Sequence, residues 1–413
     1  MCMSPDVVII GGGIAGLATA YELSRRGVSF LLLEQRTRPG GVILSEQIDG
    51  FTIDGGPDSL IIQKPEGIAL CEEIGLGDRL IATKPPRVAY IQRGGTLHAL
   101  PAASVLGIPT RVAPFVKTGL FSWTGKIRMG AELFVPARRD DEDESIGAFV
   151  TRRFGREAAR YLAEPLLAGI HAGDVDELSI RALFPRFVEA ERTHGSVLRA
   201  FRRPAANHAN TNPDGVFRSL PGGLSELVDA LVRKLPVESV ALGSVVDRLD
   251  RGHEFCVRVA DRAPIRARAV VSAVPAFATA EIVRRLDAEM AAACDSIPYA
   301  SAATVALAFR RDQIAHPLTG SGYVVPRVEN PAILAASWLS SKWPHRAPDD
   351  KVLLRTFVGG ARDPRALERS DAELVQRSLA AIAPIVGVTG APLFSRVYRW
   401  DRANAQHNVG HVG

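Results

Sequence analysis

The start of the chain has the hydrophobic pattern of a strand, a turn, a helix and a second strand. Asp6 to Ile10 is a short, mostly β-branched apolar run that predicts a strand. After a glycine-rich turn, apolar residues recur at helical spacing from Leu17 to Leu23, and Gly27 is suited to end that helix. The apolar run Val28 to Leu33 predicts the second strand. This order is typical of a nucleotide-binding βαβ unit.

The turn between the first strand and the helix fits the pattern GxGxxG. In that pattern Gly11 permits a tight turn, and Gly13 lets backbone N–H groups approach a pyrophosphate at the positive end of the helix. Gly16 lets the helix pack closely on the strand. A lone match can be a chance glycine turn, but the strand and helix around this one favour a dinucleotide site.

An acidic residue ends the second strand where such sites need one. Glu34 lies about 20 residues after the glycines, where a carboxylate accepts hydrogen bonds from a ribose. A carboxylate there would repel the 2′-phosphate of NADP. From these residues alone, the cofactor is either FAD or NAD.

Further along the chain the patterns are those of a mixed α/β protein. Pro221 to Leu224 predicts a turn before an amphipathic helix, and Val270 to Val274 predicts a fully buried strand that Pro275 ends. The middle third is mostly helical, with Arg138 to Glu144 as an exposed linker. Val105 to Ile127 mixes large apolar residues with Lys and Arg, which fits either helices in a membrane interface or helices that cover a core.

Composition limits the protein class. A chain of 413 residues with 46% hydrophobic and 23% charged residues predicts two or three folded domains, because a single core rarely grows beyond about 250–300 residues. The net charge of +5 is spread along the chain, so it suits an anionic substrate or membrane only weakly. We expect no nucleic-acid partner.

The cysteines and the termini predict a reduced protein on the cytoplasmic side. Cys2, Cys71, Cys256 and Cys294 form neither a CxxC pair nor a zinc-ligand spacing, so we expect no metal site. The N-terminus has no secretory signal, and no stretch approaches the ~20 apolar residues that span a bilayer. We therefore expect a cytoplasmic protein.

The residues after Glu34 distinguish FAD from NAD. Gln35 to Gly41 resembles the "ExxxRxGG" extension of glutathione-reductase-like flavoproteins of the amine oxidase type, in which a second glycine pair passes beside FAD. Asp54 to Ser59 is either a hairpin turn or, by the same resemblance, the "DxGP" loop that lies against the isoalloxazine ring. The resemblance therefore favours FAD.

Beyond residue 85 the chain resembles the protoporphyrinogen oxidase family, with the bacterial coproporphyrinogen oxidase branch as a near relative. The resemblance covers nearly the whole chain. Single segments of this kind are common in α/β proteins, but the ordered set is not. The matching segments are Arg87 to Ile91, Leu97 to Pro101, Glu164 to Asp174, Leu178-Ser179, Leu220 to Leu224, Val270 to Pro275 and Val358 to Gly360.

This resemblance implies the substrate and its binding residues. A porphyrinogen is an apolar macrocycle with propionate arms, so its site needs apolar walls and a cation. Arg87 aligns with the arginine that binds a propionate; the alternative is a solvated surface arginine. Gly169 aligns with the glycine whose backbone faces the macrocycle; the alternative is a helix break in Leu166 to Gly173.

The resemblance also assigns the cofactor residues. No side chain is expected to act as a catalyst, because the flavin takes the hydride and the protein positions the substrate. We expect reoxidation by dioxygen or by a membrane electron acceptor. The implied FAD-binding residues are Gly11, Gly12, Gly13, Ile14, Ala15, Gly16, Glu34, Gln35, Gly40, Gly41, Val42, Gly56, Pro57, Asp58, Ser59, Val246 and Trp400.

The fold class implied is α/β, with a glutathione-reductase-like FAD-binding Rossmann domain, a mixed-sheet substrate domain and a helical, membrane-associated domain. We assign residues 1–84 and 205–295 to the FAD-binding domain and 96–204 to the helical, membrane-surface domain. Residues 85–95 and 296–413 form the substrate domain. The sequence does not decide between a monomer and a homodimer.

The chain departs from the family near its end, where relatives continue into a "GNxxxGxGxxxC" turn that completes the FAD site. Here Ala405 to His407 differs from the family's "PQY" pattern and the sequence stops at Gly413, so we expect a fragment of a longer protein. His171 and Ala168 are smaller departures that bear on substrate choice. Two alternatives remain, an amine oxidase or carotenoid desaturase on the same scaffold, and a degenerate flavoprotein that only binds partners.

Overall fold

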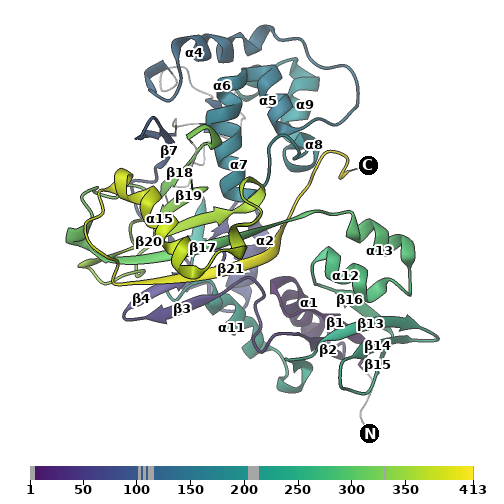
Figure 1. Cartoon of the computed structure of the whole chain (residues 1–413). Coiled ribbons are helices and arrows are strands. Elements are labelled where there is room, and N and C mark those ends of the chain that lie inside the picture. Colours follow the sequence, from purple (N-terminus) through teal and green to yellow (C-terminus); the bar gives the residue numbers. More distant parts are fainter. Residues whose placement is uncertain are drawn as a thin grey trace. The chain divides into compact units, whose positions relative to one another are not determined.

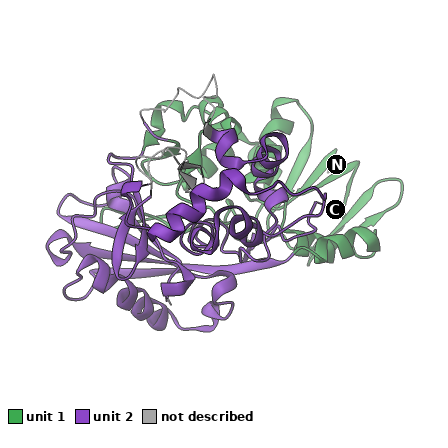
Figure 2. Cartoon of the chain, turned by 90° about the horizontal axis from the view of Figure 1, so that it is seen from above, with its two compact units in different colours: residues 1–82, 216–297 green, residues 83–215, 298–413 purple. Residues whose placement is uncertain are grey.

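The structure, a computed structural model, describes residues 5–100, 104–105, 108–109, 116–202, 214–329 and 332–412. These residues form two compact units, each built from two chain segments (Figure 2). Unit 1 comprises residues 1–82 and 216–297, and unit 2 comprises residues 83–215 and 298–413. The three-domain boundaries stay a prediction with one correction: residues 96–99, assigned to the helical domain, form a strand of the large sheet of unit 2.

Unit 1 is built on a four-stranded parallel sheet (Figure 1). Its strand order is β12-β2-β1-β16, with β1 at Val7–Ile10 and β2 at Phe30–Leu33. Helix α1, Ile14–Arg25, connects β1 to β2, and Gly27 follows its end with a φ of 67°. The predicted strand–turn–helix–strand order is therefore confirmed. The outer strands are β12, Val240–Ala241, and β16, Ala269–Ser272.

Alternate side chains of β1 enter two different cores, as the twofold period of a strand requires. Ile9 packs in a core with Leu17 of α1 and with α11, Ser225–Lys234. Val8 and Ile10 pack in a second core, which lies on the opposite face of the sheet. The sheet is thus covered on both faces, as in doubly wound folds. The predicted amphipathic helix after Pro221 is α11, and its Leu227, Val228 and Leu231 are buried.

The rest of unit 1 flanks this sheet. A three-stranded antiparallel sheet carries α12 on one side, and two smaller sheets complete the unit. The strand predicted at Val270 to Val274 ends at Ser272, and Val270 and Val271 are only half-buried, so full burial was wrong. The remaining elements are β3 Ser45–Ile48, β4 Phe51–Asp54, β5 Leu60–Ile61, α2 Pro65–Glu73, η1 Gly77–Arg79, β6 Ile81–Ala82, β11 Phe217–Ser219, η4 Val237–Ser239, β13 Val246–Arg251, β14 Phe255–Val259, β15 Ile265–Ala267, α12 Ala276–Val283 and α13 Ala288–Asp295.

Unit 2 contains a seven-stranded mixed sheet with the order β21-β17-β20-β19-β18-β7-β8 (Figure 1). Only β7 and β18 pair in parallel; the other neighbours are antiparallel. Helix α15, Asp371–Val386, contributes Leu374 and Ile382 to the core on one face of the sheet. The strands are β7 Ala89–Arg93, β8 Thr96–Ala99, β17 Tyr299–Arg310, β18 Gly322–Val324, β19 Ala335–Trp338, β20 Lys351–Gly359 and β21 Phe394–Ala405.

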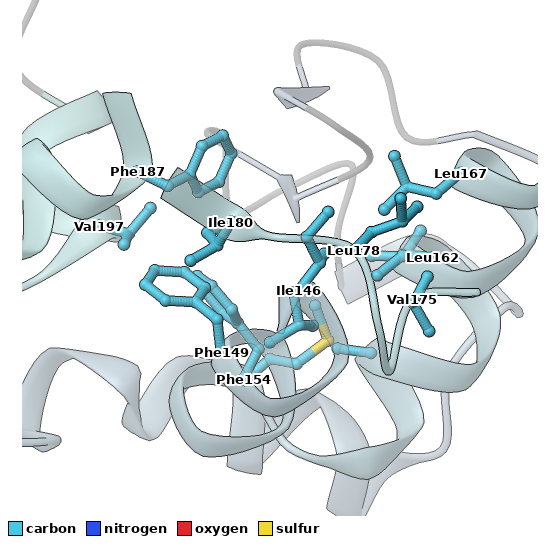
Figure 3. Close-up of a cluster of buried hydrophobic side chains, with 14 of the residues drawn as sticks. Ile146, Phe149, Phe154, Leu162, Leu167, Val175, Leu178, Ile180, Phe187 and Val197 are labelled. Atoms are coloured by element: carbon cyan, nitrogen blue, oxygen red, sulfur yellow. The ribbon is translucent and has the colours of Figure 1, made fainter. Parts of the chain in front are cut away.

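The helices between residues 123 and 202 share a separate core, in which Phe149 and Phe187 meet edge to face at a centroid distance of 6.3 Å (Figure 3). Part of the predicted interface segment Val105 to Ile127 lies outside the described residues. The remaining elements are β9 Ser104–Val105, β10 Ile108–Pro109, α4 Trp123–Gly130, η2 Ala131–Phe134, α5 Ile146–Phe154, α6 Arg156–Ala158, the π-helix η3 Ala159–Ala163, α7 Glu164–His171, α8 Ile180–Leu183, α9 Pro185–His194, α10 Val197–Arg202, η5 Arg311–Gln313, η6 Arg327–Glu329, α14 Leu339–Lys342, η7 Gly360–Arg362 and η8 Ala366–Glu368.

A buried ion pair holds these helices together. Arg153 of α5 and Glu132 of η2 are both fully buried, and Arg153 Nε donates to Glu132 Oε1 at 2.8 Å. The same carboxylate accepts the Val197 N–H at 2.9 Å. The segment predicted as an exposed linker is irregular, as expected, but Glu144 at its end pairs with Arg152 of α5.

We expect Arg153→Met to lower the free energy of unfolding by about 3–5 kcal/mol, because it leaves the Glu132 carboxylate buried without its cation. Equilibrium urea unfolding followed by circular dichroism measures this loss. Arg192→Met is the matched control, since its partner Asp141 is exposed and the change should cost at most about 1 kcal/mol. Equal losses in the two variants would contradict the assignment.

Candidate functional site

The glycine turn of unit 1 has the geometry that its sequence predicts. Gly11 has a φ of 108°, in the region that favours glycine, and a Cβ there would lie 2.8 Å from the Ala273 carbonyl oxygen. A Cβ on Gly16 would lie 1.9 Å from the Gly11 carbonyl oxygen. Both positions therefore exclude any side chain, and α1 begins directly against the end of β1.

Gly13 differs from these two glycines because the space beside it is open. A Cβ there would meet no atom within 4 Å. Gly13 is also the N-cap of α1, and no side chain caps the helix or places an acid in its first turn. Uncapped first-turn N–H groups at the positive end of a helix suit an anion such as a diphosphate.

Glu34 follows β2 and lies beside this turn, with 6% of its surface exposed. Its Oε2 accepts the Gly12 N–H at 2.6 Å, and its Oε1 accepts the Arg36 N–H at 2.8 Å. A Cβ on Gly12 would lie 2.9 Å from Glu34 Cβ, which explains the glycine between the other two. The turn thus orients the carboxylate that is expected to bind the ribose.

The second glycine pair passes beside the first. Gly40 forms a parallel bridge with Gly13, and its N–H donates to the Gly12 carbonyl at 2.7 Å. Arg38 holds the loop by donating to the carbonyls of Gly41 at 2.7 Å and Ile43 at 3.0 Å. Burial, together with nearby Arg36, lowers the pKa of the Arg38 guanidinium. The loop places Gln35 and Val42 in this neighbourhood, although their contact with a cofactor stays a prediction.

The Asp54 to Ser59 segment is not a hairpin turn. It connects β4 to β5, and these strands belong to different sheets, β4 pairing with β3 and β5 with β11. Ser219 Oγ of β11 donates to the Asp58 carbonyl at 2.7 Å and helps to hold the loop. The hairpin alternative is therefore wrong, whereas contact of Gly56, Pro57, Asp58 and Ser59 with a flavin stays a prediction.

The sequence analysis missed the role of Asp54. This fully buried residue accepts a hydrogen bond from Ser45 Oγ at 2.6 Å and the Leu224 N–H at 3.0 Å. Gly223 has a φ of 90°, and a Cβ there would lie 2.3 Å from Ser45 Oγ. Pro221 to Leu224 is therefore a close packing partner of this loop as well as a turn before α11. The paired glycines of that segment were the available signal.

Of the remaining predicted residues, Arg87, Gly169 and Trp400 lie in unit 2. Arg87 is exposed; its Nε donates to Thr83 Oγ1 at 3.1 Å, and within the described part of the chain no carboxylate forms an ion pair with it. Trp400 lies in β21 opposite Ala302. Val246 belongs to unit 1, where it begins β13. Their binding roles stay predictions.

Gly169 lies inside α7, so the helix-break alternative is wrong. A Cβ on Gly169 would approach Val324 Cγ1 of β18 to 3.3 Å and Ala335 Cβ of β19 to 4.0 Å. A glycine here therefore lets α7 lie close to the sheet. This packing is a second reason for a glycine at position 169, in addition to the expected contact with the macrocycle.

Comparison with known proteins shows which family has this sequence pattern. The family model described as flavin-containing amine oxidoreductase matches residues 14–411, from the first residue of α1 almost to the end of the chain. The chain belongs to this family. Its cofactor is FAD, and the open space at Gly13, the uncapped start of α1 and the buried Glu34 carboxylate fit the diphosphate and ribose of that cofactor.

Several curated relatives match nearly the whole chain. Proteins named coproporphyrinogen III oxidase from Bacillus subtilis and Staphylococcus aureus are 34% and 32% identical; the matches cover 98% and 99% of this chain and 88% and 90% of theirs. The chloroplastic protoporphyrinogen oxidase of Nicotiana tabacum is 28% identical over 98% of this chain and 77% of its own length.

A solved structure from Exiguobacterium sp., described as a candidate protoporphyrinogen oxidase, superposes with a TM-score of 0.87 at 32% identity. It covers 99% of this chain and 89% of its own. Putrescine oxidase, at 17% identity and a TM-score of 0.72, with 99% of this chain and 89% of its own covered, shares the fold. The α/β flavoprotein fold with mixed sheets predicted from the sequence is thus confirmed.

We expect Gly13→Ala to fold like the wild type but to bind FAD at least about tenfold more weakly, because the methyl group enters the space for the diphosphate. The φ of Gly13 is −71°, which alanine adopts without strain. Flavin content per chain and FAD titration measure the effect. Gly130→Ala is the matched control, since a Cβ there also meets nothing within 4 Å. Unchanged FAD affinity in Gly13→Ala would overturn this placement.

Proposed function

We propose that this flavin-dependent oxidase converts a porphyrinogen to the corresponding porphyrin in haem synthesis, with coproporphyrinogen III as its preferred substrate over protoporphyrinogen IX. The observation that carries the proposal is the similarity, at 32–34% identity over nearly the whole chain, to relatives named coproporphyrinogen III oxidase. Amine oxidases such as putrescine oxidase are similar only at the level of the fold.

The residues of the chain fit the roles that this reaction needs. In unit 1 the first-turn N–H groups of α1 bind the diphosphate and Glu34 binds the ribose. In unit 2 Arg87 offers a guanidinium to a propionate, and the backbone of Gly169 faces the macrocycle. When bound, FAD would supply the hydride acceptor, with dioxygen as the proposed final oxidant and hydrogen peroxide as its product.

We expect the FAD-loaded protein to raise porphyrin fluorescence under air well above the spontaneous rate, and to do so faster with coproporphyrinogen III than with protoporphyrinogen IX. Arg87→Met should raise the KM for coproporphyrinogen III by about tenfold, since it removes one charge-assisted contact with a propionate. Arg396→Met, an exposed arginine of unit 2 on β21, is the control. A fluorescence rate no higher than without protein would reject the proposal.

We also propose that an apolar surface of unit 2 contacts a membrane. Trp123 and Ile127, one helical turn apart on α4, are 67% and 72% exposed, and Phe134 of η2 is 87% exposed. The ammonium of Lys126 lies 4.5 Å from the Trp123 ring centroid, but it is buried and donates to the Val116 carbonyl at 2.8 Å, so it holds the indole ring and does not face a membrane. In the described part of the chain, no helix has the length and apolarity that a bilayer span needs. The contact that we propose is peripheral and made by these exposed side chains.

We expect the double substitution Trp123→Ser and Ile127→Ser to abolish flotation with phosphatidylglycerol vesicles, because it removes the apolar groups that enter the interface. The control is Val237→Ser, which changes an apolar residue of unit 1 that is even more exposed, at 94%. Flotation of the double variant at the wild-type level would refute this contact.

A further inference from the structure

Helix α7 lies between the helical core and the sheet of unit 2. On one side Leu167 enters the core that Figure 3 shows, together with Leu162 of the preceding π-helix. On the other side the missing side chain of Gly169 brings the helix against Val324 of β18. A shift of α7 would therefore move Gly169 relative to the strands.

A carboxylate ties the start of α7 to two loops of the sheet. Glu164 Oε1 lies 2.5 Å from Arg362 Nη2, and Glu164 Oε2 accepts the Arg327 N–H at 2.9 Å. Arg362 Nη1 donates to the Val325 carbonyl at 2.7 Å. The side chains of Arg362 and Glu164 are only 8% and 14% exposed. The loops involved follow β18 and β20, so the pair joins the helix to both strands.

The end of α7 is attached to the same sheet. Ala172 follows the helix in the left-handed region, and its carbonyl accepts the Ala361 N–H at 2.7 Å. A Cβ on Gly360 would lie 2.5 Å from that carbonyl oxygen, so only glycine allows this approach. Gln406, which follows β21, donates from its buried amide to the His171 carbonyl at 3.0 Å. Both ends of α7 are thus held by loops that leave sheet strands.

These contacts give a structural role to residues of the family segment Glu164 to Asp174 other than Gly169. Leu167 and Ala168 are apolar and buried, so they favour keeping α7 in the core without defining its position along its own axis. The polar contacts at its two ends are directional, and a buried ion pair contributes more to a specific arrangement than to net stability. Asp174 adds an exposed pair with Arg327 at 3.1 Å.

We propose that Glu164 and Arg362 are positioning residues: their ion pair fixes α7 along the sheet and thereby sets where Gly169 meets the macrocycle. The inference rests on the proposed porphyrinogen oxidation. Neither residue is proposed to touch the substrate. Loss of the pair should therefore weaken substrate binding while the chemistry at the flavin continues.

The test is the double substitution Glu164→Leu and Arg362→Met, which removes both charges and leaves neither buried alone. We expect wild-type FAD content and thermal midpoint, a KM for coproporphyrinogen III raised about tenfold, and a kcat within about twofold of the wild type. Hydrogen exchange at the amides of residues 166–171 should be about tenfold faster. The single variant Arg362→Lys keeps a cation beside Glu164, so its KM should lie between those of the wild type and the double variant.

Arg377→Met is the matched control, since it breaks a partly exposed pair with Asp363, 3.8 Å away, and should leave KM and exchange unchanged. A folded double variant with wild-type KM and wild-type exchange in α7 would overturn the proposal. A lower thermal midpoint with unchanged KM would do the same, because it would mark a purely structural pair.

Failure of the underlying function gives a different result. In that case the wild type neither oxidises coproporphyrinogen III nor binds coproporphyrin III in a fluorescence titration. Hydrogen exchange in α7 still decides whether the ion pair holds the helix: faster exchange in the double variant supports that part of the proposal, and unchanged exchange refutes it.

Discussion

The geometry of the nucleotide site depends on the close approach of Gly16 to the Gly11 carbonyl. A side chain on Gly16 would lie 1.9 Å from that oxygen, so α1 begins against the end of β1 only because none is present. This start places the first-turn N–H groups of the helix beside the end of β1. It also brings the Gly12 N–H to the carboxylate of Glu34. A Cβ on Gly13 would meet no atom within 4 Å, although a parallel bridge joins Gly13 to Gly40 of the second glycine pair.

Unit 2 contains two ion pairs whose side chains are largely buried. Glu132 and Arg153 tie helices to one another, whereas Glu164 and Arg362 tie a helix to the sheet. A buried pair of charges adds little net stability, since desolvation offsets most of the attraction. Such pairs instead penalise arrangements in which one charge is left alone. Both pairs therefore define where helices lie, and α7 carries the residue expected to face the substrate.

The fold alone does not select the substrate. Putrescine oxidase has the same architecture at 17% identity, so one scaffold serves substrates as different as a small amine and, as proposed here, a macrocycle. We expect the difference in substrate to come from residues of unit 2. Arg87 and Gly169 are the two that the family resemblance identifies. The structure adds the ion pair at the start of α7, whose members are separated by 198 positions in the chain.

The sequence by itself determined the βαβ unit, the FAD fingerprint and Glu34, because these follow from hydrophobic period and from glycines close together in the chain. It did not determine how Asp54 to Ser59 is held: the N–H that binds Asp54 belongs to Leu224, 170 positions away. It likewise left Gly169 open between a helix break and a functional contact, since Val324 limits the space there only after folding. Local pattern specifies elements, whereas partners distant in the sequence are chosen only when the elements pack.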